Sequence, residues 1–213
     1  MAAFDLEEQE TLDEIRAWWK QYGRWVKLGI GAILIAAVGF GGWQYWQKSQ
    51  RDAAGGLYFQ LETAFDSRDT VKVRDLADKL AADYPRSPYT PRAQMLAARR
   101  DLEAGKVADA EKRLKSVIAD AKEPIMRDMA RLRLSSVLLD ERKHEEALKV
   151  LDKPEVPQYG RLFDDRRGDI LLGLGKTAEA RKAWQTAFDA ATRDSAFKAW
   201  LQLKLDALGD EAK

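Results

Sequence analysis

Residues 28–47 form a run of twenty positions without a charged side chain, closed by Lys27 on one side and Lys48 on the other. At about 1.5 Å per residue, a helix of that length spans the roughly 30 Å hydrocarbon core of a bilayer. The mean hydropathy of the whole chain is nevertheless −0.48, so the rest is polar in character. The sequence therefore predicts one membrane helix joined to a soluble portion.

Aromatic side chains crowd both ends of this run, where amphipathic rings prefer the headgroup layer. They are Trp18, Trp19, Tyr22 and Trp25 before it and Trp43, Tyr45 and Trp46 at its end. A buried core helix, the first alternative, needs neither aromatic collars nor a glycine-rich interior. A cleavable signal peptide is the second alternative, because Ala37-Val38-Gly39 has the small-x-small form of a cleavage site. The acidic segment before the run favours an uncleaved anchor, since a secretory n-region is short and basic.

The charges that flank the run predict its orientation. Four basic residues lie within fifteen positions before it and two lie as close after it: Arg16, Lys20, Arg24 and Lys27, then Lys48 and Arg51. The positive-inside rule therefore places the N-terminus in the cytoplasm and residues 48–213 across the membrane. The expected parts are a cytoplasmic head (1–27), a transmembrane signal anchor (28–47), a linker (48–56) and a domain across the membrane (57–213).

Ala37 and Gly41 form a small-xxx-small pair inside the run. Such spacing lets two helix backbones approach closely in lipid. We therefore predict that this face of the anchor contacts the span of a partner, although small residues are also frequent in spans that contact nothing.

The composition argues against several classes of function. The chain has no cysteine and one histidine, and its 36 basic and 35 acidic residues are interspersed, so no basic stripe marks a nucleic-acid partner. The acidic residues lie among lysines and arginines at helical spacing, which is typical of a solvated face. His144 lies in an expected turn and is expected at the surface. Gly175-Lys176-Thr177 lacks the earlier glycine of a P-loop, because Ile170 occupies that position. We therefore expect no catalytic site, metal or cofactor.

From Gly56 onward helix-forming residues dominate, and prolines and glycines interrupt them. A turn motif recurs with alanines at Ala110, Ala147 and Ala180, which lie 37 and 33 residues apart. This spacing is close to the 34-residue period of tetratricopeptide repeats. The chain is therefore predicted to be all-α: a transmembrane helix followed by a tetratricopeptide-like solenoid. An unrelated helical bundle is the alternative.

The expected helix pairs cover 90–103 and 107–119, 126–140 and 144–152, and 161–173 and 177–191, after a degenerate first unit over 57–84. In the last pair, Trp184 is expected to fill the room that Gly168, Ala180 and Ala187 leave. A closing helix over 195–208, capped by Gly209, covers the end of the solenoid. Its apolar stripe is predicted to comprise Phe197, Trp200, Leu201, Leu205 and Leu208.

The first helix of each pair lines the concave side of such a solenoid. Positions 18, 15 and 11 before each motif alanine share one helix face. They are Arg92, Met95 and Arg99; Met129, Leu132 and Ser136; and Leu162, Asp165 and Asp169. This mixed lining suits peptide or protein segments, although the apolar members can equally belong to the core.

An acidic head, the lead-in Ile-Arg-Ala-Trp-Trp-Lys, a glycine-rich span that ends Gly-Gly-Trp-Gln-Tyr-Trp, and degenerate repeats follow one another along the chain. In this order they resemble the YfgM family, the ancillary subunits of the bacterial SecYEG translocon. The resemblance implies a single-pass, type II protein of the bacterial inner membrane whose repeat domain (57–213) is periplasmic. It also implies association with the SecYEG translocon and with the periplasmic chaperone PpiD, and assistance to newly translocated client proteins. An envelope-assembly or cell-division adaptor of the same layout is the alternative function, and an enzyme of unrecognised chemistry a distant third.

Overall fold

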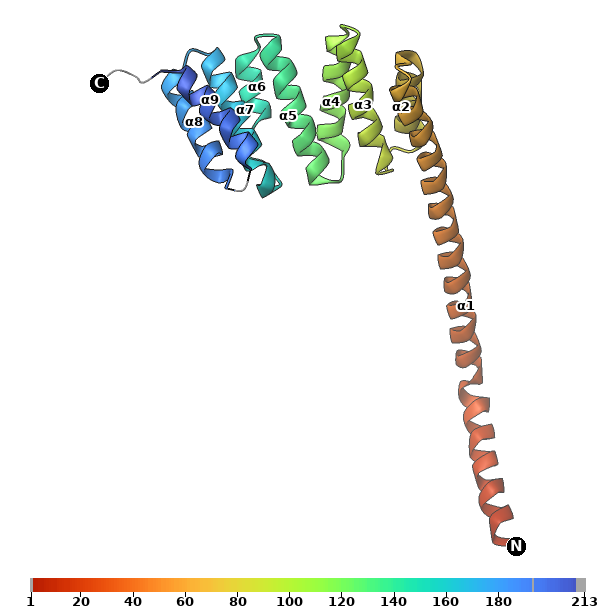
Figure 1. Cartoon of the computed structure of the whole chain (residues 1–213). Coiled ribbons are helices and arrows are strands. Elements are labelled where there is room, and N and C mark those ends of the chain that lie inside the picture. Colours follow the sequence, from red (N-terminus) through yellow and green to blue (C-terminus); the bar gives the residue numbers. More distant parts are fainter. Residues whose placement is uncertain (1, 193, 210–213) are drawn as a thin grey trace. The chain divides into compact units, whose positions relative to one another are not determined.

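The computed structural model describes the backbone of residues 2–192 and 194–209, with side chains from Thr11 onward. The four acidic side chains of the head before that point, at Asp5, Glu7, Glu8 and Glu10, lie outside the described residues. The all-α fold is confirmed (Figure 1). Within those limits the helices are α1 (Ala2–Asp66), α2 (Thr70–Asp83), α3 (Tyr89–Glu103), α4 (Val107–Asp120), α5 (Pro124–Asp140), α6 (His144–Val150), the short 3-10 helix η1 (Pro157–Tyr159), α7 (Gly160–Gly173), α8 (Thr177–Ala190) and α9 (Ser195–Ala207).

Helix α1 contains the predicted membrane span. It is long and apolar enough to cross a membrane, with a mean hydropathy of 1.7 over its most apolar window and none of that window buried. The helix is continuous through residues 48–56, where the sequence analysis places a linker. The chain divides into two compact units after Asp52, and each is described by itself below. A long, unburied apolar helix is consistent with a membrane anchor.

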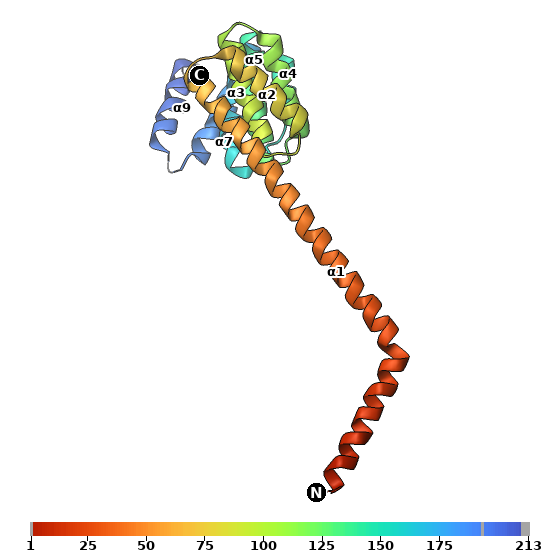
Figure 2. The same cartoon turned by 90° about the vertical axis from the view of Figure 1, so that its right-hand side faces the viewer.

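The second unit begins inside α1. Ala54, Leu61 and Ala64 are buried there and pack with residues of α2 and α3, among them Val73 and Leu80. The degenerate first repeat expected over 57–84 is therefore a helix pair, made by the end of α1 and by α2. Figures 1 and 2 show the following helices stacked one after another up to α9.

The turns inside the helix pairs share one hydrogen-bond pattern. The backbone N–H groups of Asp69, Lys106, Lys143 and Lys176 donate to carbonyls five residues earlier, at 2.9, 2.8, 2.8 and 2.9 Å. The residue before each donor has a positive φ: 60° at Arg68, 73° at Gly105, 58° at Arg142 and 74° at Gly175. This is the Schellman motif, which satisfies the last carbonyls of a helix and suits glycine best. The repeat therefore occurs four times in the part of the chain that the structure describes.

The motif alanines pack at the centre of the stack. Ala110, Ala147 and Ala180 are fully buried, and the first two belong to one continuous core that runs from α3 to α7. The prediction for the last pair is confirmed as well. Trp184 is buried in van der Waals contact with Gly168, beside the buried Ala187.

Helix α9 closes the stack, as predicted, but with a narrower apolar stripe. Leu201 and Leu205 are buried with Trp184, and Phe197 and Leu208 pack partly against them. The prediction for Trp200 was wrong, because its side chain is 52% exposed. Leu201, one position later on the helix, takes the core-facing place, and the Trp200 ring lies outside with the Nζ of Lys204 5.1 Å from its centroid.

The expectation that His144 is a surface residue was also wrong. His144 is the first residue of α6 and is half-buried, with a buried Nδ1. Its ring lies against Gly173 of α7, where an added Cβ would be 2.7 Å from Cε1. The glycine lets the imidazole join two consecutive repeats.

Candidate binding surface

A groove of about 490 Å³ lies between α3 and α5, the first helices of two consecutive repeats. Three of the nine residues predicted for the concave face line it together: Met95 and Arg99 from α3, and Ser136 from α5. Arg99 and Ser136 meet because each lies eleven residues before the motif alanine of its repeat, and Met95 lies one turn before Arg99 on the same face of α3. We call this space the α3–α5 groove.

The floor of the groove is apolar. Met95 and Val137 are buried in the main core, and Leu114 of α4 lies beneath them. Leu102, the second-last residue of α3, is 37% exposed and leaves an apolar surface open to solvent. A side chain that entered the groove would therefore contact hydrocarbon.

The rim of the groove carries two arginines. Arg99 pairs with Glu103, with Nε 3.0 Å from Oε1, and its guanidinium lies 5.4 Å from the ring centroid of Phe65. Arg133 of α5 lies on the same groove. Partial desolvation, and then the positive charge of Arg99, lower the pKa of Arg133 below its ordinary value. Among the described side chains, none forms an ion pair or a hydrogen bond with the Arg133 guanidinium.

The sequence analysis did not include Arg133 among the predicted site residues. It lies 14 positions before Ala147, between two of the chosen offsets. The signal was present, because Met129, Arg133, Ser136 and Asp140 follow one another at i, i+4, i+7 and i+11 on one helix face.

Two of the nine predicted residues lie mainly against the core. Met129 and Leu132 are part-buried and pack on the main apolar cluster. The backbone carbonyl of Leu132 also accepts a 2.9 Å hydrogen bond from the Ser136 hydroxyl. These contacts leave only part of either side chain for a ligand.

The remaining four predicted residues lie away from the groove. Arg92 pairs with Glu123 at 2.8 Å, and Leu162 is part-buried on α7. Asp165 and Asp169 hold the Nζ of Lys204 at 2.6 and 2.5 Å. Burial raises the pKa of Asp165, although its contact with Lys204 opposes the shift. These two aspartates therefore tie the closing helix α9 to α7.

Both small residues of the predicted membrane contact are exposed on α1. A Cβ added to Gly41 would meet nothing within 4 Å, and Ala37 is likewise unburied. Their contact with a partner span remains a prediction.

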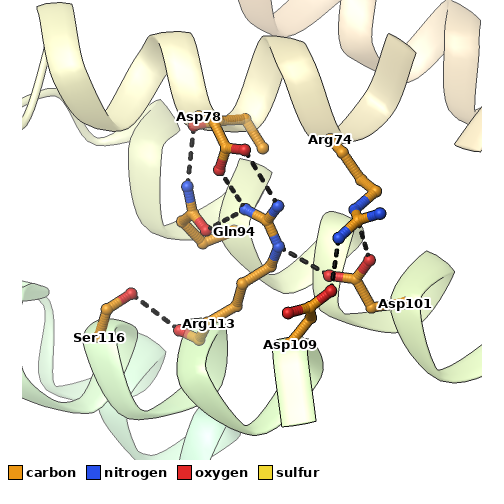
Figure 3. A network of polar contacts seen from close by, with 8 residues as sticks. Arg74, Asp78, Gln94, Asp101, Asp109, Arg113 and Ser116 are labelled. Carbon is orange, nitrogen blue, oxygen red and sulfur yellow. Dashed lines mark hydrogen bonds and ion pairs between the residues drawn. The ribbon is translucent and has the colours of Figure 1, made fainter. Parts of the chain in front are cut away.

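A buried polar network joins α2, α3 and α4 (Figure 3). Asp101 of α3 is fully buried between Arg74 of α2, at 2.8 Å, and Arg113 of α4, at 2.7 Å. Arg113 also reaches Asp78 at 2.6 Å and Gln94 at 2.8 Å. Asp101 is thus not on the solvated face that the charge pattern indicated. The network fixes α3 against both its neighbours.

Within the side chains that the structure describes, no group of three or more His, Cys, Asp or Glu lies close enough to hold a metal ion. The surface is instead a groove with an apolar floor and a charged rim, which suits a segment of another protein.

Comparison with known proteins agrees with this picture. Residues 16–210 match the family described as a tetratricopeptide repeat-like domain. The ancillary SecYEG translocon subunit of Neisseria gonorrhoeae is 30% identical over 210 residues, which cover 97% of this chain and 99% of that protein. The chain belongs to the family of ancillary SecYEG translocon subunits. The resemblance to the YfgM family is thereby confirmed.

More distant members of the family match over similar lengths. The ancillary SecYEG translocon subunit of Escherichia coli is 24% identical over 207 residues, covering 94% of this chain and 96% of that protein. The Haemophilus influenzae subunit is 23% identical over 191 residues, covering 87% and 90%. Among solved structures, a putative kinesin light chain of Podospora anserina with nearly identical tetratricopeptide-like repeats matches with a TM-score of 0.53 at 17% identity. That match covers 76% of this chain and 84% of the other, and it concerns the fold alone.

Proposed function

We propose that this protein is a membrane-anchored, non-enzymatic binding protein of the SecYEG translocon. Its anchor is held in the bacterial inner membrane, and its repeat domain lies in the periplasm. There it links the translocon to the chaperone PpiD and assists newly translocated client proteins. The apolar anchor keeps the repeat domain beside the membrane. The α3–α5 groove, which has an apolar floor and a charged rim, offers a surface for protein segments.

One observation carries this proposal. The match to the Neisseria gonorrhoeae subunit covers nearly the whole of both chains, so it includes the anchor as well as the repeats. A likeness confined to the repeats would fit many unrelated binding proteins, because the repeat fold supports many partners. A match over nearly the full length of both chains favours a shared place at the translocon.

Co-purification tests the partners. The full chain, tagged at its C-terminus, is extracted from membranes in mild detergent and captured. We expect SecY and PpiD in the eluate, at levels well above those captured by an unrelated single-span protein with the same tag. Recovery of peptidoglycan or outer-membrane assembly proteins without SecY would contradict the proposal and favour an envelope-assembly adaptor.

Thiol labelling tests the orientation. The chain has no native cysteine, so single cysteines at Asp5 and Asp66 have a clean background. In intact spheroplasts, a membrane-impermeant thiol reagent is expected to label the cysteine at position 66 and to leave that at position 5 unlabelled. Labelling at position 5 alone would reverse the orientation, and labelling only of a shortened product would show that the anchor is cleaved.

A further inference from the structure

We propose that the α3–α5 groove binds an extended acidic segment of a partner protein. A carboxylate of that segment lies between Arg99 and Arg133, and a neighbouring apolar side chain lies on Met95 and Leu102. This inference rests on the proposed function, because it specifies which chemistry the binding protein recognises in its partner.

The first support is the unpaired charge of Arg133. Neighbouring arginines of the same repeat have carboxylate partners: Arg131 pairs with Asp128 at 3.1 Å, and Arg127 pairs with Glu155. Arg133 has no such partner among the described side chains, and its nearest charged influence is Arg99, which is also positive. Both arginines are exposed at the rim of one groove, where two like charges repel each other and an incoming carboxylate would relieve this repulsion.

The second support is the geometry of the two guanidiniums. They lie on α3 and α5, the first helices of two consecutive repeats, and both line the α3–α5 groove, so a carboxylate bound in the groove has two positive charges beside it. Guanidinium–carboxylate hydrogen bonds are charge-assisted and are roughly twice as strong as those between neutral groups. Arg99 already pairs with Glu103 at a site that is largely exposed, and such a pair contributes little. Arg99 can therefore exchange that partner at small cost.

The apolar floor of the groove and its two acidic lining residues favour a peptide over a free anion. A phosphate or a bare carboxylate would make no apolar contact with the surface at Met95 and Leu102. An apolar side chain next to an acidic residue would make that contact. Asp140 and Glu141, at the C-terminal end of α5, also line the groove. They can accept hydrogen bonds from peptide N–H groups and disfavour a second acidic residue there. The groove thus orients an acidic–apolar segment.

The test uses the full chain in phosphatidylcholine nanodiscs, with empty nanodiscs as the blank. The probe is a fluorescein-labelled octapeptide in which glutamate alternates with leucine, and its twin carries glutamine in place of glutamate. Fluorescence anisotropy is expected to show the acidic peptide bound about tenfold more tightly than its twin, which corresponds to about 1.4 kcal/mol. The preference is expected to fall as salt is raised, because the rim charges are partly exposed.

Variants assign the preference to the groove. Arg133→Glu and Arg99→Glu are each expected to abolish it, and Arg133→Lys is expected to retain part of it. Lys182→Glu is the matched control, since it makes the same charge change at an exposed position of α8, away from the groove. Far-UV circular dichroism checks that each variant keeps its helices, and Arg133→Gln replaces Arg133→Glu if the latter unfolds.

Several outcomes would overturn the inference. One is equal binding of the two peptides. Another is a preference for the acidic peptide that is unchanged in both Arg133→Glu and Arg99→Glu, or lost equally in Lys182→Glu. A third is displacement of the acidic peptide by phosphatidylglycerol vesicles, which would point to a lipid headgroup. If the peptide preference is absent while SecY still co-purifies, only this inference fails. If the preference is present but SecY is not recovered, only the proposed function fails.

Discussion

A methyl group added to Gly168 of α7 would lie 2.3 Å from Nε1 of Trp184 on α8, so the glycine leaves the room that the indole occupies. The indole is 2% exposed, and its N–H donates to the carbonyl of Asp165 at 3.1 Å and to Oδ1 of Asp169 at 3.2 Å. One missing side chain on α7 therefore permits both the burial and the hydrogen bonding of a large one on α8.

Gly168→Ala is expected to destabilise the repeat domain. The added carbon would overlap a rigid ring, and overpacking of this kind typically costs about 1–3 kcal/mol, more than the roughly 1 kcal/mol that alanine gains over glycine in a helix. Chemical denaturation of the full chain in detergent measures the change. Gly160→Ala on the same helix is the control, because its added carbon meets nothing within 4 Å. Equal effects of the two substitutions would disprove the close contact.

Trp184→Ala is expected to cost roughly 3–5 kcal/mol, because it empties a large buried site. That is a large share of a typical domain stability of about 5–15 kcal/mol. The two substitutions are also expected to be coupled: once the indole is gone, Gly168→Ala no longer overlaps anything and becomes neutral or stabilising. A double-mutant cycle measures this coupling, and simple additivity of the two effects would argue against direct packing.

Asp101→Asn tests the buried network of Figure 3. The carboxylate is fully buried between Arg74 and Arg113, and removal of one partner from a buried ion pair typically costs about 3–5 kcal/mol. Asp78→Asn is the control, because Asp78 contacts the same Arg113 with a side chain that is 64% exposed, and such pairs contribute about 1 kcal/mol or less. Equal unfolding free energies for the two variants would show that burial of Asp101 matters little.

The N-cap of α9 predicts a pH dependence. The side chain of Asp194 accepts a 3.0 Å hydrogen bond from the Phe197 N–H and pairs with Arg161 at 2.9 Å. These two contacts, the backbone hydrogen bond first, hold the pKa of Asp194 below its ordinary value of 3.8. A carboxyl with a depressed folded-state pKa adds stability above its unfolded-state pKa, and this stability is lost as the pH falls through the folded-state pKa.

Wild type is therefore expected to melt above Asp194→Asn at pH 7, with a difference that shrinks once the pH falls below roughly 4. Asparagine can still cap the helix but carries no charge, so the comparison isolates the ionised form. Thermal melts across this pH range measure the effect. A melting difference that is the same at neutral and acid pH would contradict the assignment.

The recurring alanines and the Gly168–Trp184 pair could be predicted from the sequence because close helix crossings demand small residues at fixed spacing. The first turn was harder to recognise, since Val73 stands where the other three units carry the motif alanine. Its left-handed residue is Arg68, as it is Arg142 in the third turn, where the other two turns have glycine. In the structure, its hydrogen bond to the preceding helix identifies it as the same motif.

Burial of charged and amphipathic residues could not be predicted in the same way. The charge pattern predicts a solvated carboxylate at Asp101. The structure shows it buried, because Arg74 and Arg113 from two other helices form ion pairs with it. Trp200 is apolar enough for the core, but the neighbouring Leu201 occupies that place. In both cases the outcome depends on partners from other elements or on the exact rotation of a helix, which periodicity alone does not fix.

Photo-cross-linking in living cells asks whether the anchor touches the translocon. A photoreactive residue is placed singly at Ala37, at Gly41, and at Ile35 on the opposite face of the helix. We expect cross-links to a SecYEG subunit from Ala37 and Gly41 and few or none from Ile35, because the small residues permit close approach of another span. Absence of a SecYEG product from all three positions, in cells where the protein is inserted and intact, would contradict its placement at the translocon.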